Sequence, residues 1–414
     1  MTVTEQLGRR VKEASRQLAA LSSGKKNEAL AAVADAIWAR REEILAANAA
    51  DIAAGREAGL REGLIDRLTL TEERVLGICE AVRKLIALED PAGVIESGSV
   101  RPNGLRIEKV RVPIGAVGII FESRPNVAAD GAALCLKSGN AVLLRGGKEA
   151  IRSNTALVSV MRAAIAGCGL PEDSVLLVED TSRQSANEMM KLHGVLDLLI
   201  PRGGAGLIRA VVENATVPVI ETGVGNCHIY LEQTADPEMA ERITVNAKTS
   251  RVSVCNAAES LLVDEGCAAD LLPWVAKALM DRGVALRGCP KACALVPGMA
   301  LADEEDYGTE YLDYVMSVKV VSGLDEAIAH IARYSTGHSE AIVTRDYAAA
   351  ERFLNEVDSA AVYVNASTRF TDGGEFGLGA EIGISTQKLH ARGPMGLAAL
   401  TTCKYKVYGS GQIR

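Results

Sequence analysis

Apolar and polar positions in the first part of the chain recur with a helical period. Over residues 1–90, charged positions alternate with alanine-rich apolar positions, which predicts two or three amphipathic helices. From about residue 99 the period changes. The stretch VRPNGLRIEKVRVP then predicts two exposed strands joined by a turn at Asn103-Gly104.

Short β-branched runs next alternate with helical segments. The predicted strands are IGAVGIIFE (114–122), AVLLRG (141–146), SVLLVE (174–179), LDLLI (196–200) and VPVIET (217–222). Helical patterns lie between them, at about 126–137, 153–166, 185–193 and 204–214. This βαβα order predicts a parallel sheet with helices on both faces.

A second series of the same kind begins after about residue 225. Its predicted strands are SLLV (260–263), YVMSVKVV (314–321), EAIVT (340–344) and AAVYVNA (360–366), and its helices lie near 236–248, 267–281, 324–334 and 347–357. The fold class is therefore α/β. The tail TTCKYKVYGSGQIR predicts a last strand that needs a partner edge, and another subunit is one source of such an edge.

Composition narrows the range of partners. The 414 residues suffice for two to three domains, and 48% of them are hydrophobic and 24% charged. The net charge is −8, and no run of Lys and Arg is long enough for a nucleic-acid footprint. We therefore expect no DNA or RNA partner.

The chain also lacks the signals of export and membrane insertion. Its first residues, MTVTEQLGRRVKEASRQLAA, form an amphipathic pattern without the apolar stretch of a signal peptide. No apolar run approaches the roughly 20 residues that span a membrane. The nine cysteines are odd in number and scattered, which indicates reduced thiols and a cytoplasmic protein.

Three loops have the position at which α/β sheets bind ligands, after a strand and before a helix. Asn126 opens a helix in FESRPNVAAD. Arg145 and Lys148 flank the glycines of LLRGGKEA, and the pair Gly203-Gly204 precedes a helix in LIPRGGAGLI. None of the loops matches G-x-G-x-x-G. Plain turns would account for the glycine pairs, but the basic residues beside them favour a phosphate-bearing ligand.

Two further residues are candidates for chemistry. Glu221 ends an apolar run in ETGVGNCHIY, where a capping role is the alternative to catalysis. Cys255 lies in KTSRVSVCNAAESLLV at the turn into a buried strand, where it is a nucleophile or a small hydrophobic residue. A metal site is not expected, because Cys289 and Cys293 have no second ligand pair at zinc spacing. No G-x-S-x-G motif is present.

Together these features resemble a known family. An asparagine that opens a helix, a basic residue ending the next strand, a Glu-x-Gly turn and a cysteine 34 residues later are similar to the aldehyde dehydrogenase superfamily. The resemblance is narrower to the branch that reduces γ-glutamyl phosphate, and runs from about residue 5 to 410. It rests on FESRPNVAADGAALCLKSGNAVLLRGG, IPRGGAGLI, ETGVGNCHIY, SVCNAAESLLV, DEAIAHIARYSTGHSEAI and VNASTRFTDGGEFGLGAEIGIST.

The resemblance implies a fold and a division of the chain. Its fold has two parallel-sheet α/β domains, a Rossmann-like cofactor domain and a catalytic domain, with a small β oligomerisation element. We expect the NADP-binding domain at 1–98 and 114–224, rejoined by about 367–390. The catalytic domain would be 225–366, and the oligomerisation strands 99–113 with 391–414.

The resemblance also implies a reaction, the NADPH-dependent reduction of glutamyl 5-phosphate to glutamate 5-semialdehyde in proline biosynthesis. Cys255 would displace phosphate and form a thioester, which hydride then reduces. The Asn126 amide and the backbone N–H of Cys255 would bind the oxyanion. Glu221 stands where hydrolytic relatives activate water, so here a proton-handling or thiol-activating role competes with a structural one.

The cofactor NADP(H) would be held by five residues. The resemblance places Arg145 at the adenosine ribose and Glu310 at the nicotinamide ribose. Lys148 stands where relatives that prefer NAD carry an acid, so a cation there favours the 2′-phosphate of NADPH. Gly203 and Gly204 would permit close approach of the pyrophosphate.

Substrate and partners complete the expectations. Arg251 and Arg369 flank the cysteine and the NAST loop, and we assign them to the substrate α-carboxylate, although a surface arginine is the commoner alternative. His338 has no assigned role and would at least fix a loop. The partners are glutamyl 5-phosphate, a second subunit in a dimer or tetramer, and a transient contact with glutamate 5-kinase.

Two other functions compete. One is a hydrolytic NAD(P)-dependent semialdehyde dehydrogenase of the same superfamily, which would not depend on phosphate. The other is a catalytically silent cofactor-binding scaffold, which the joint presence of Cys255, Asn126 and Glu221 argues against.

Overall fold

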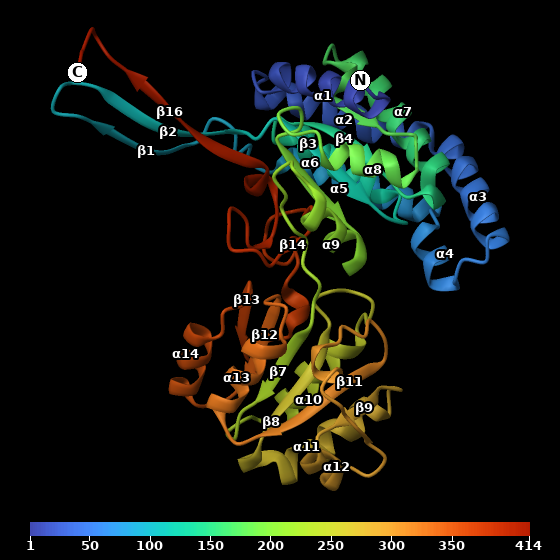
Figure 1. Ribbon diagram of the computed structural model, residues 1–414, viewed down its shortest axis with the longest axis vertical. Coiled ribbons are helices and arrows are strands. Elements are labelled where there is room, and N and C mark those ends of the chain that lie inside the picture. Colours follow the sequence, from blue (N-terminus) through green and yellow to red (C-terminus); the bar gives the residue numbers. More distant parts are fainter. The chain divides into compact units, whose positions relative to one another are not determined.

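The computed structural model describes all residues from 1 to 414, and they form two compact units (Figure 1). Unit 1 comprises Met1–Thr222, Gly377–Gly383 and Met395–Arg414, and unit 2 comprises Gly223–Phe376 and Ile384–Pro394. Each unit contains its own parallel sheet, which confirms the predicted α/β class. No helix is both long and apolar enough to cross a membrane.

Five helices precede the first strand of unit 1, so the prediction of two or three was wrong. They are α1 (Val3–Leu18), α2 (Ser23–Ala39), α3 (Arg41–Glu57), α4 (Glu62–Leu68) and α5 (Glu72–Ala87). Polar caps divide the helical pattern. The side chains of Thr2, Ser22 and Thr71 each accept a hydrogen bond from a backbone N–H three residues later.

The sheet of unit 1 has the order β5-β4-β3-β6. Its strands are β3 (Ala116–Phe121), β4 (Ala141–Arg145), β5 (Val175–Leu177) and β6 (Leu198–Arg202), and its helices are α6 (Asn126–Lys137), α7 (Ile151–Gly167), α8 (Arg183–Met190) and α9 (Ala205–Asn214). The predicted strand at 217–222 was wrong: only an isolated bridge joins Val219 to Leu199. Pro218 lacks the N–H that a continuing ladder would need.

The strand order places a crevice between β3 and β6. From β3 the chain proceeds outward to β4 and β5, and it then returns to the opposite side of β3 to form β6. Such a reversal of direction leaves a crevice at the carboxyl ends of the two strands, where open α/β sheets bind ligands. In unit 1 these ends are followed by Glu122 and by Gly203.

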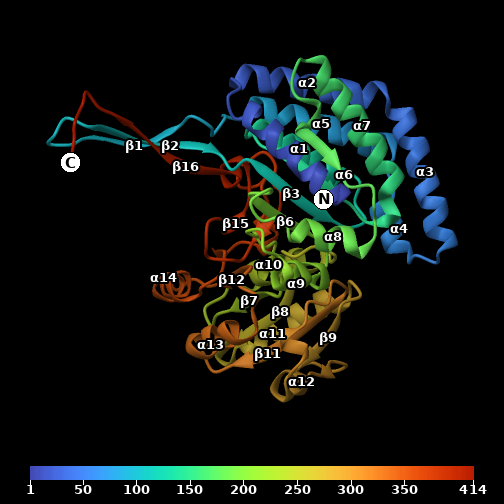
Figure 2. The ribbon, with the colours of Figure 1, turned by 45° about the horizontal axis from the view of Figure 1, so that its top comes forward.

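A separate three-stranded antiparallel sheet also belongs to unit 1. It has the order β1-β2-β16, with β1 (Ile95–Val100), β2 (Arg106–Pro113) and β16 (Thr401–Tyr408). Figures 1 and 2 show these strands extending away from the helices of their unit. The last strand finds a partner edge in the same chain, along β2.

The sheet of unit 2 has seven parallel strands in the order β10-β9-β11-β8-β7-β12-β13. They are β7 (Cys227–Leu231), β8 (Ala258–Asp264), β9 (Ala285–Gly288), β10 (Ala300–Leu301), β11 (Val315–Val321), β12 (Ser339–Val343) and β13 (Ala361–Val364). Its helices are α10 (Pro237–Thr249), α11 (Glu265–Met280), α12 (Pro290–Leu295), α13 (Leu324–Tyr334) and α14 (Tyr347–Glu356). The short strands β14 (Ile384–Ser385) and β15 (Gly393–Pro394) pair with each other in a separate antiparallel sheet.

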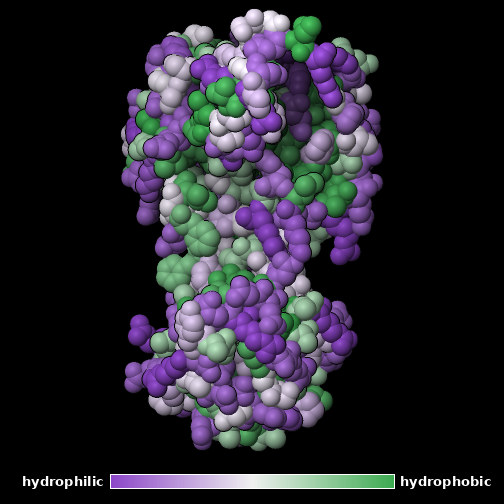
Figure 3. Space-filling view, turned by 90° about the vertical axis from the view of Figure 1, so that its left-hand side faces the viewer, coloured by the Kyte–Doolittle hydropathy of each residue, from purple (hydrophilic) through white to green (hydrophobic).

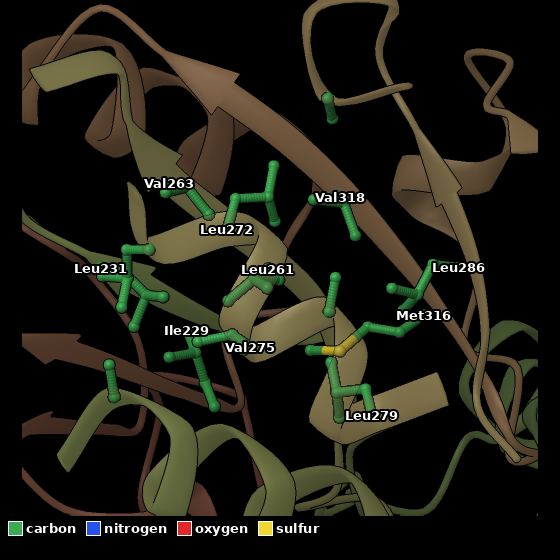
Figure 4. Packing of buried hydrophobic residues seen from close by; sticks show 14 of the residues in the cluster. Ile229, Leu231, Leu261, Val263, Leu272, Val275, Leu279, Leu286, Met316 and Val318 are labelled. Carbon is green, nitrogen blue, oxygen red and sulfur yellow. The ribbon is translucent and has the colours of Figure 1, made fainter. Parts of the chain in front are cut away.

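Side chains of the central strands alternate between two cores. Ile229 and Leu231 enter a cluster with residues of α10 and α11, which Figure 4 shows in close-up. Tyr230, on the opposite face of β7, joins a second cluster with residues of α13 and α14. Because both faces are buried, the strand CHIYL has no polar alternation, and the sequence pattern missed it. On the outside, polar residues cover most of the face seen in Figure 3.

One ion pair is enclosed in unit 2. The Lys248 Nζ lies 2.5 Å from the Glu259 Oε2, and both side chains are fully buried. Burial lowers the pKa of Lys248 and raises that of Glu259 to about 7. The second oxygen, Glu259 Oε1, accepts the backbone N–H of Leu312 at 3.1 Å, so the carboxylate is hydrogen-bonded on both sides.

We predict that Lys248→Met destabilises the protein by about 3–5 kcal/mol, because it leaves a buried carboxylate without its cation. The loss should be smaller at pH 5 than at pH 8, since protonation of Glu259 removes the unpaired charge. Urea unfolding at both pH values measures this. The double variant Lys248→Met/Glu259→Gln is the control, and it should lose less stability than Lys248→Met alone at pH 8.

Candidate functional site

The predicted nucleophile lies in a tight turn of unit 2. The chain leaves α10 at Thr249 and enters β8 at Ala258, and between them the Ala257 N–H donates to the Val254 carbonyl at 3.1 Å. This bond makes Cys255 a central residue of the turn. All nine cysteines of the chain are thiols rather than disulfides.

The segment that opens β7 lies against this turn. A Cβ on Gly225 would stand 1.5 Å from the Cys255 carbonyl oxygen, so only a glycine fits there. The thiol of Cys227 donates to the same carbonyl oxygen at 3.1 Å. The peptide that follows the predicted nucleophile is therefore fixed by backbone contact on one side and by a thiol on another.

The next residue, Asn256, ties the turn to the NAST loop. Its side-chain nitrogen donates to the Thr371 carbonyl at 2.9 Å, and its own carbonyl accepts the Thr368 hydroxyl at 2.8 Å. The guanidinium of Arg369 donates to its side-chain oxygen. These bonds hold Cys255 between two anchored neighbours.

Two cations lie beside the thiol. Arg369 donates from Nε to the Ser250 hydroxyl at 3.0 Å, while Arg251 is exposed. Burial, and then the charge of Arg251, lower the pKa of Arg369, and the charges of Asp372, then of Cys255 and Cys227, act in the opposite direction. The structure thus brings together three residues predicted from sequence, Cys255, Arg251 and Arg369. The exposed guanidinium of Arg251 can receive an anion, and the charge of Asp372 offsets part of that of Arg369.

Glu310 reaches the same cluster through Gly225. Its Oε1 accepts the Gly225 N–H at 2.7 Å, and burial raises its pKa. The carboxylate is therefore fixed next to the glycine on which the Cys255 turn rests.

His338 contacts residues that surround the Cys255 turn. Its Nδ1 lies 2.8 Å from the Ser339 hydroxyl and 3.7 Å from the Cys227 thiol. The Ser339 hydroxyl is hydrogen-bonded to Thr371, which is hydrogen-bonded to Tyr363, at 2.7 Å in each case. Burial lowers the pKa of His338 to about 4, so the ring is neutral. The sequence singled out His338 without a role, and it missed the contact of Cys227 with Cys255.

All of these residues gather at the amino ends of the unit 2 strands. Gly225 precedes β7, Cys255 precedes β8, and His338 precedes β12. Ligands of open parallel sheets usually bind at the carboxyl ends. The cluster of unit 2 therefore departs from the rule that guided the choice of loops in unit 1.

In unit 1, Asn126 is the first residue of α6. Its Nδ2 donates to the Asp130 Oδ2, one helical turn later, at 2.8 Å. Burial raises the pKa of Asp130 to about 6, although the bond from Asn126 and the charge of Arg202 act against this. The sequence analysis did not single out Asp130, and the spacing of four residues is the signal that would have found it.

An internal anion lies at the carboxyl ends of β3 and β6. The Glu122 Oε2 accepts the N–H of Gly204 at 2.9 Å, at the amino end of α9. A Cβ on Gly203 would lie 2.5 Å from the same oxygen. The two predicted glycines thus already surround a carboxylate, at a helix end that favours negative charge.

The remaining predicted residues of unit 1 lie at neighbouring strand ends. Arg145 ends β4 and donates to the carbonyls of Thr181 and Ser182 at 2.6 and 2.8 Å, which closes the loop after β5. Lys148 is exposed in the short helix that follows β4. Glu221 is the second-last residue of the Met1–Thr222 segment of the unit and follows Val219, which bridges to β6, by two positions. No group of three or more His, Cys, Asp and Glu side chains is arranged to hold a metal ion.

Comparison with known proteins gives consistent matches. The model of the aldehyde dehydrogenase family matches residues 4–284 and 295–401. A curated relative from Heliobacterium modesticaldum, named gamma-glutamyl phosphate reductase, is 59% identical over 407 residues, 98% of each chain. A relative of the same name from Carboxydothermus hydrogenoformans is 60% identical over 408 residues, 99% of this chain and 98% of its own.

Solved structures agree. The crystal structure of gamma-glutamyl phosphate reductase from Thermotoga maritima superposes with a TM-score of 0.98 at 50% identity, and covers 100% of both chains. An acetylating aldehyde dehydrogenase from Geobacillus thermoglucosidasius has a TM-score of 0.71 at 17% identity, over 99% of this chain and 97% of its own, and shows the fold alone.

We predict that Gly225→Ala displaces the turn that carries Cys255, because its methyl group would overlap the Cys255 carbonyl. Overpacking of this kind costs about 1–3 kcal/mol or more. Urea unfolding gives the stability, and mass-spectrometric mapping of iodoacetamide labelling gives the reactivity of Cys255, which should change. Gly308→Ala is the control, since a Cβ there meets nothing within 4 Å. Equal behaviour of the two variants would contradict the prediction.

Proposed function

The chain belongs to the aldehyde dehydrogenase family and, within it, to the γ-glutamyl phosphate reductases, and on this premise we propose its reaction. The protein reduces L-glutamyl 5-phosphate to L-glutamate 5-semialdehyde and phosphate, with NADPH as the reductant. This is the second step of proline biosynthesis from glutamate.

The observation that carries the proposal is the pair of arginines beside Cys255. A glutamyl substrate brings an α-carboxylate and, at its other end, an acyl phosphate, so both ends are anionic. Arg251 is exposed and available to an anion, whereas Arg369 is already bonded to Ser250 and Asn256. We assign the α-carboxylate to Arg251, with Arg369 contributing its charge.

Cys255 performs the acyl transfer in this proposal. Its thiolate attacks the acyl carbonyl carbon, a carbon–sulfur bond forms, and the carbon–oxygen bond to phosphate breaks with the electron pair leaving on phosphate. Hydride transfer then gives the aldehyde, and the sulfur leaves again as the thiolate. Phosphate is a far better leaving group than hydroxide, so a thiolate can displace it from an acyl phosphate.

Both halves of the reaction pass through a tetrahedral oxyanion. We assign its binding to the backbone N–H of Cys255 and to the side-chain amide of Asn126. Glu221 is proposed as a proton-handling group and not as an activator of water, because water would hydrolyse the thioester. The SRPN sequence before α6 lacks the aromatic residue usual in the superfamily, which supports a polar and anionic substrate.

A nicotinamide nucleotide would supply the hydride. In unit 1 an exposed Lys148 and the guanidinium of Arg145 would receive the adenosine half, and the cation at position 148 supports NADPH over NADH. Gly203 and Gly204 fit an anion, because they already surround the Glu122 carboxylate, which a pyrophosphate at that helix end would have to displace. In unit 2, Glu310 would hold the nicotinamide ribose.

A homo-oligomer is also part of the proposal. The outer edges of β1 and β16 have no partner strand in the three-stranded sheet, and long unpaired edges favour association. Chromatography with light scattering would give the number of subunits.

We predict that Cys255→Ser abolishes phosphate- and NADP-dependent oxidation of glutamate 5-semialdehyde while NADPH still binds, because a hydroxyl at this position is a poor nucleophile. The assay is the absorbance of NADPH, and binding is followed by its fluorescence. Cys168→Ser, in unit 1, is the control and should retain full rate. Full activity of Cys255→Ser would exclude thioester chemistry there, and activity without phosphate would favour the hydrolytic alternative.

We predict that Arg251→Gln raises KM for glutamate 5-semialdehyde by about 10–100-fold, the value of one charge-assisted hydrogen bond. The kcat should change little, because the α-carboxylate is bound equally before and during the reaction. Steady-state kinetics at saturating NADP and phosphate measure both constants. Arg242→Gln, an exposed arginine on α10, serves as the matched control. An unchanged KM would remove Arg251 from the substrate site.

A further inference from the structure

The bond between Asn126 and Asp130 has a direction that chemistry fixes. An asparagine side chain carries a carbonyl oxygen and an NH₂ group of nearly equal size, and a half-turn about its last torsion exchanges them. An ionised carboxylate can only accept hydrogen bonds. The Asp130 Oδ2, at 2.8 Å, therefore requires that the nitrogen of Asn126, and not its oxygen, face it.

This direction matters for a group that must donate. One N–H of the amide is used by Asp130, and the other remains on the same nitrogen, about 120° away. If the amide turned over, its carbonyl oxygen would occupy the place of the nitrogen and would repel a negative charge. A donor to an oxyanion contributes to the rate only while it is held in place before the reaction.

We infer that Asp130 is a positioning residue that keeps the Asn126 amide with its nitrogen, not its oxygen, toward the reacting carbonyl. The inference rests on the proposed role of Asn126 as an oxyanion donor. In this inference Asp130 acts through Asn126, to which it is hydrogen-bonded. A protonated Asp130 could donate to the Asn126 oxygen instead, and the amide would then be free to turn over.

The electrostatics of α6 set the pH at which this happens. Burial raises the pKa of Asp130 to about 6, and the opposing contributions come from the Asn126 bond and from Arg202 at the end of β6. The elements packed against α6, which include α2, α5, α7, β3 and β4, place no other charge that acts on Asp130. The fixed orientation of the Asn126 amide is therefore present above pH 6, and it is lost as the pH falls through that value and Asp130 is protonated.

We predict that Asp130→Asn lowers kcat about 10-fold with KM and NADPH binding unchanged, because a neutral amide accepts Asn126 in either orientation. Asn126→Ala should fall further, by about 10²–10³, the usual loss of one oxyanion donor. The pH profile of kcat between 5 and 8 is the second measurement. Relative to wild type, Asp130→Asn should lack the fall near pH 6, whereas Asp130→Glu should restore both the rate and the fall.

Three controls separate this inference from a structural role and from the proposed function. The melting temperature of Asp130→Asn at pH 7.5 should not decrease, because a carboxylate with a raised pKa costs the folded state stability once it is ionised. Asp35→Asn, an exposed residue of α2, should leave every value unchanged. Finally, Asn126→Ala/Asp130→Asn should be no slower than Asn126→Ala alone, since both changes act on one group.

The outcomes are distinct. Wild-type kcat and an unchanged pH profile in Asp130→Asn would overturn the inference, as would additive losses in the double variant. Wild-type rate in Asn126→Ala would instead overturn the proposed role of Asn126. A lower melting temperature with a proportional loss of NADPH binding would show that Asp130 serves only the fold.

Discussion

The backbone contact between Gly225 and Cys255 is the constraint on which unit 2 depends. The strand β7 begins at Cys227 and the turn before β8 contains Cys255, so two neighbouring strands meet through their entry segments. The carbonyl of Cys255 occupies the place where a side chain at position 225 would stand. The Gly225 N–H is then directed at Glu310, which brings a carboxylate to the same place. The absence of a side chain at position 225 thus places Cys255 and Glu310 against the same glycine.

Charge in unit 2 is distributed unevenly between the interior and this entry edge. In the interior Lys248 is matched by Glu259, and the Glu340 carboxylate accepts from the backbone and ring of His228. At the edge the charge of Arg251 acts on Arg369, and Asp372 offsets part of this positive charge. A buried charge that is paired is closed to a ligand, whereas an exposed cation such as Arg251 can bind an anion. This contrast is why the edge, and not the buried pair, is the place to look for substrate.

The sequence predicted the βα alternation of both sheets, since its strands are short β-branched runs and α6 and α13 begin and end where the pattern changes. It missed β7 because five buried residues after a glycine-rich loop have neither alternation nor length, and it added a strand at 217–222 that Pro218 interrupts. The cluster of Cys255, Arg251 and Arg369 could be predicted from the sequence, because these residues lie in or near one turn and one loop. The contacts of Cys227 and His338 were not, because residues 28 and 111 positions apart meet only through strand order.

Unit 1 presents two donors of different kinds, and this bears on how the chain handles a reactive acyl group. In unit 1 the amide of Asn126 and the N–H of Gly204 both already bind carboxylates of the chain itself, Asp130 and Glu122. An internal anion holds a donor in place without water. Such a donor can still bind a ligand under one of two conditions. Either the donor has a second N–H that the anion does not use, or the ligand displaces the anion. Asn126 satisfies the first condition, because its side-chain nitrogen has two hydrogens. The backbone nitrogen of Gly204 has only one hydrogen, so a ligand at Gly204 must displace the anion. An internal carboxylate therefore gives a permanent donor at α6 and an exchangeable donor at α9. This difference is the one expected between a group that acts on the reacting carbonyl and a group that receives a cofactor in each cycle.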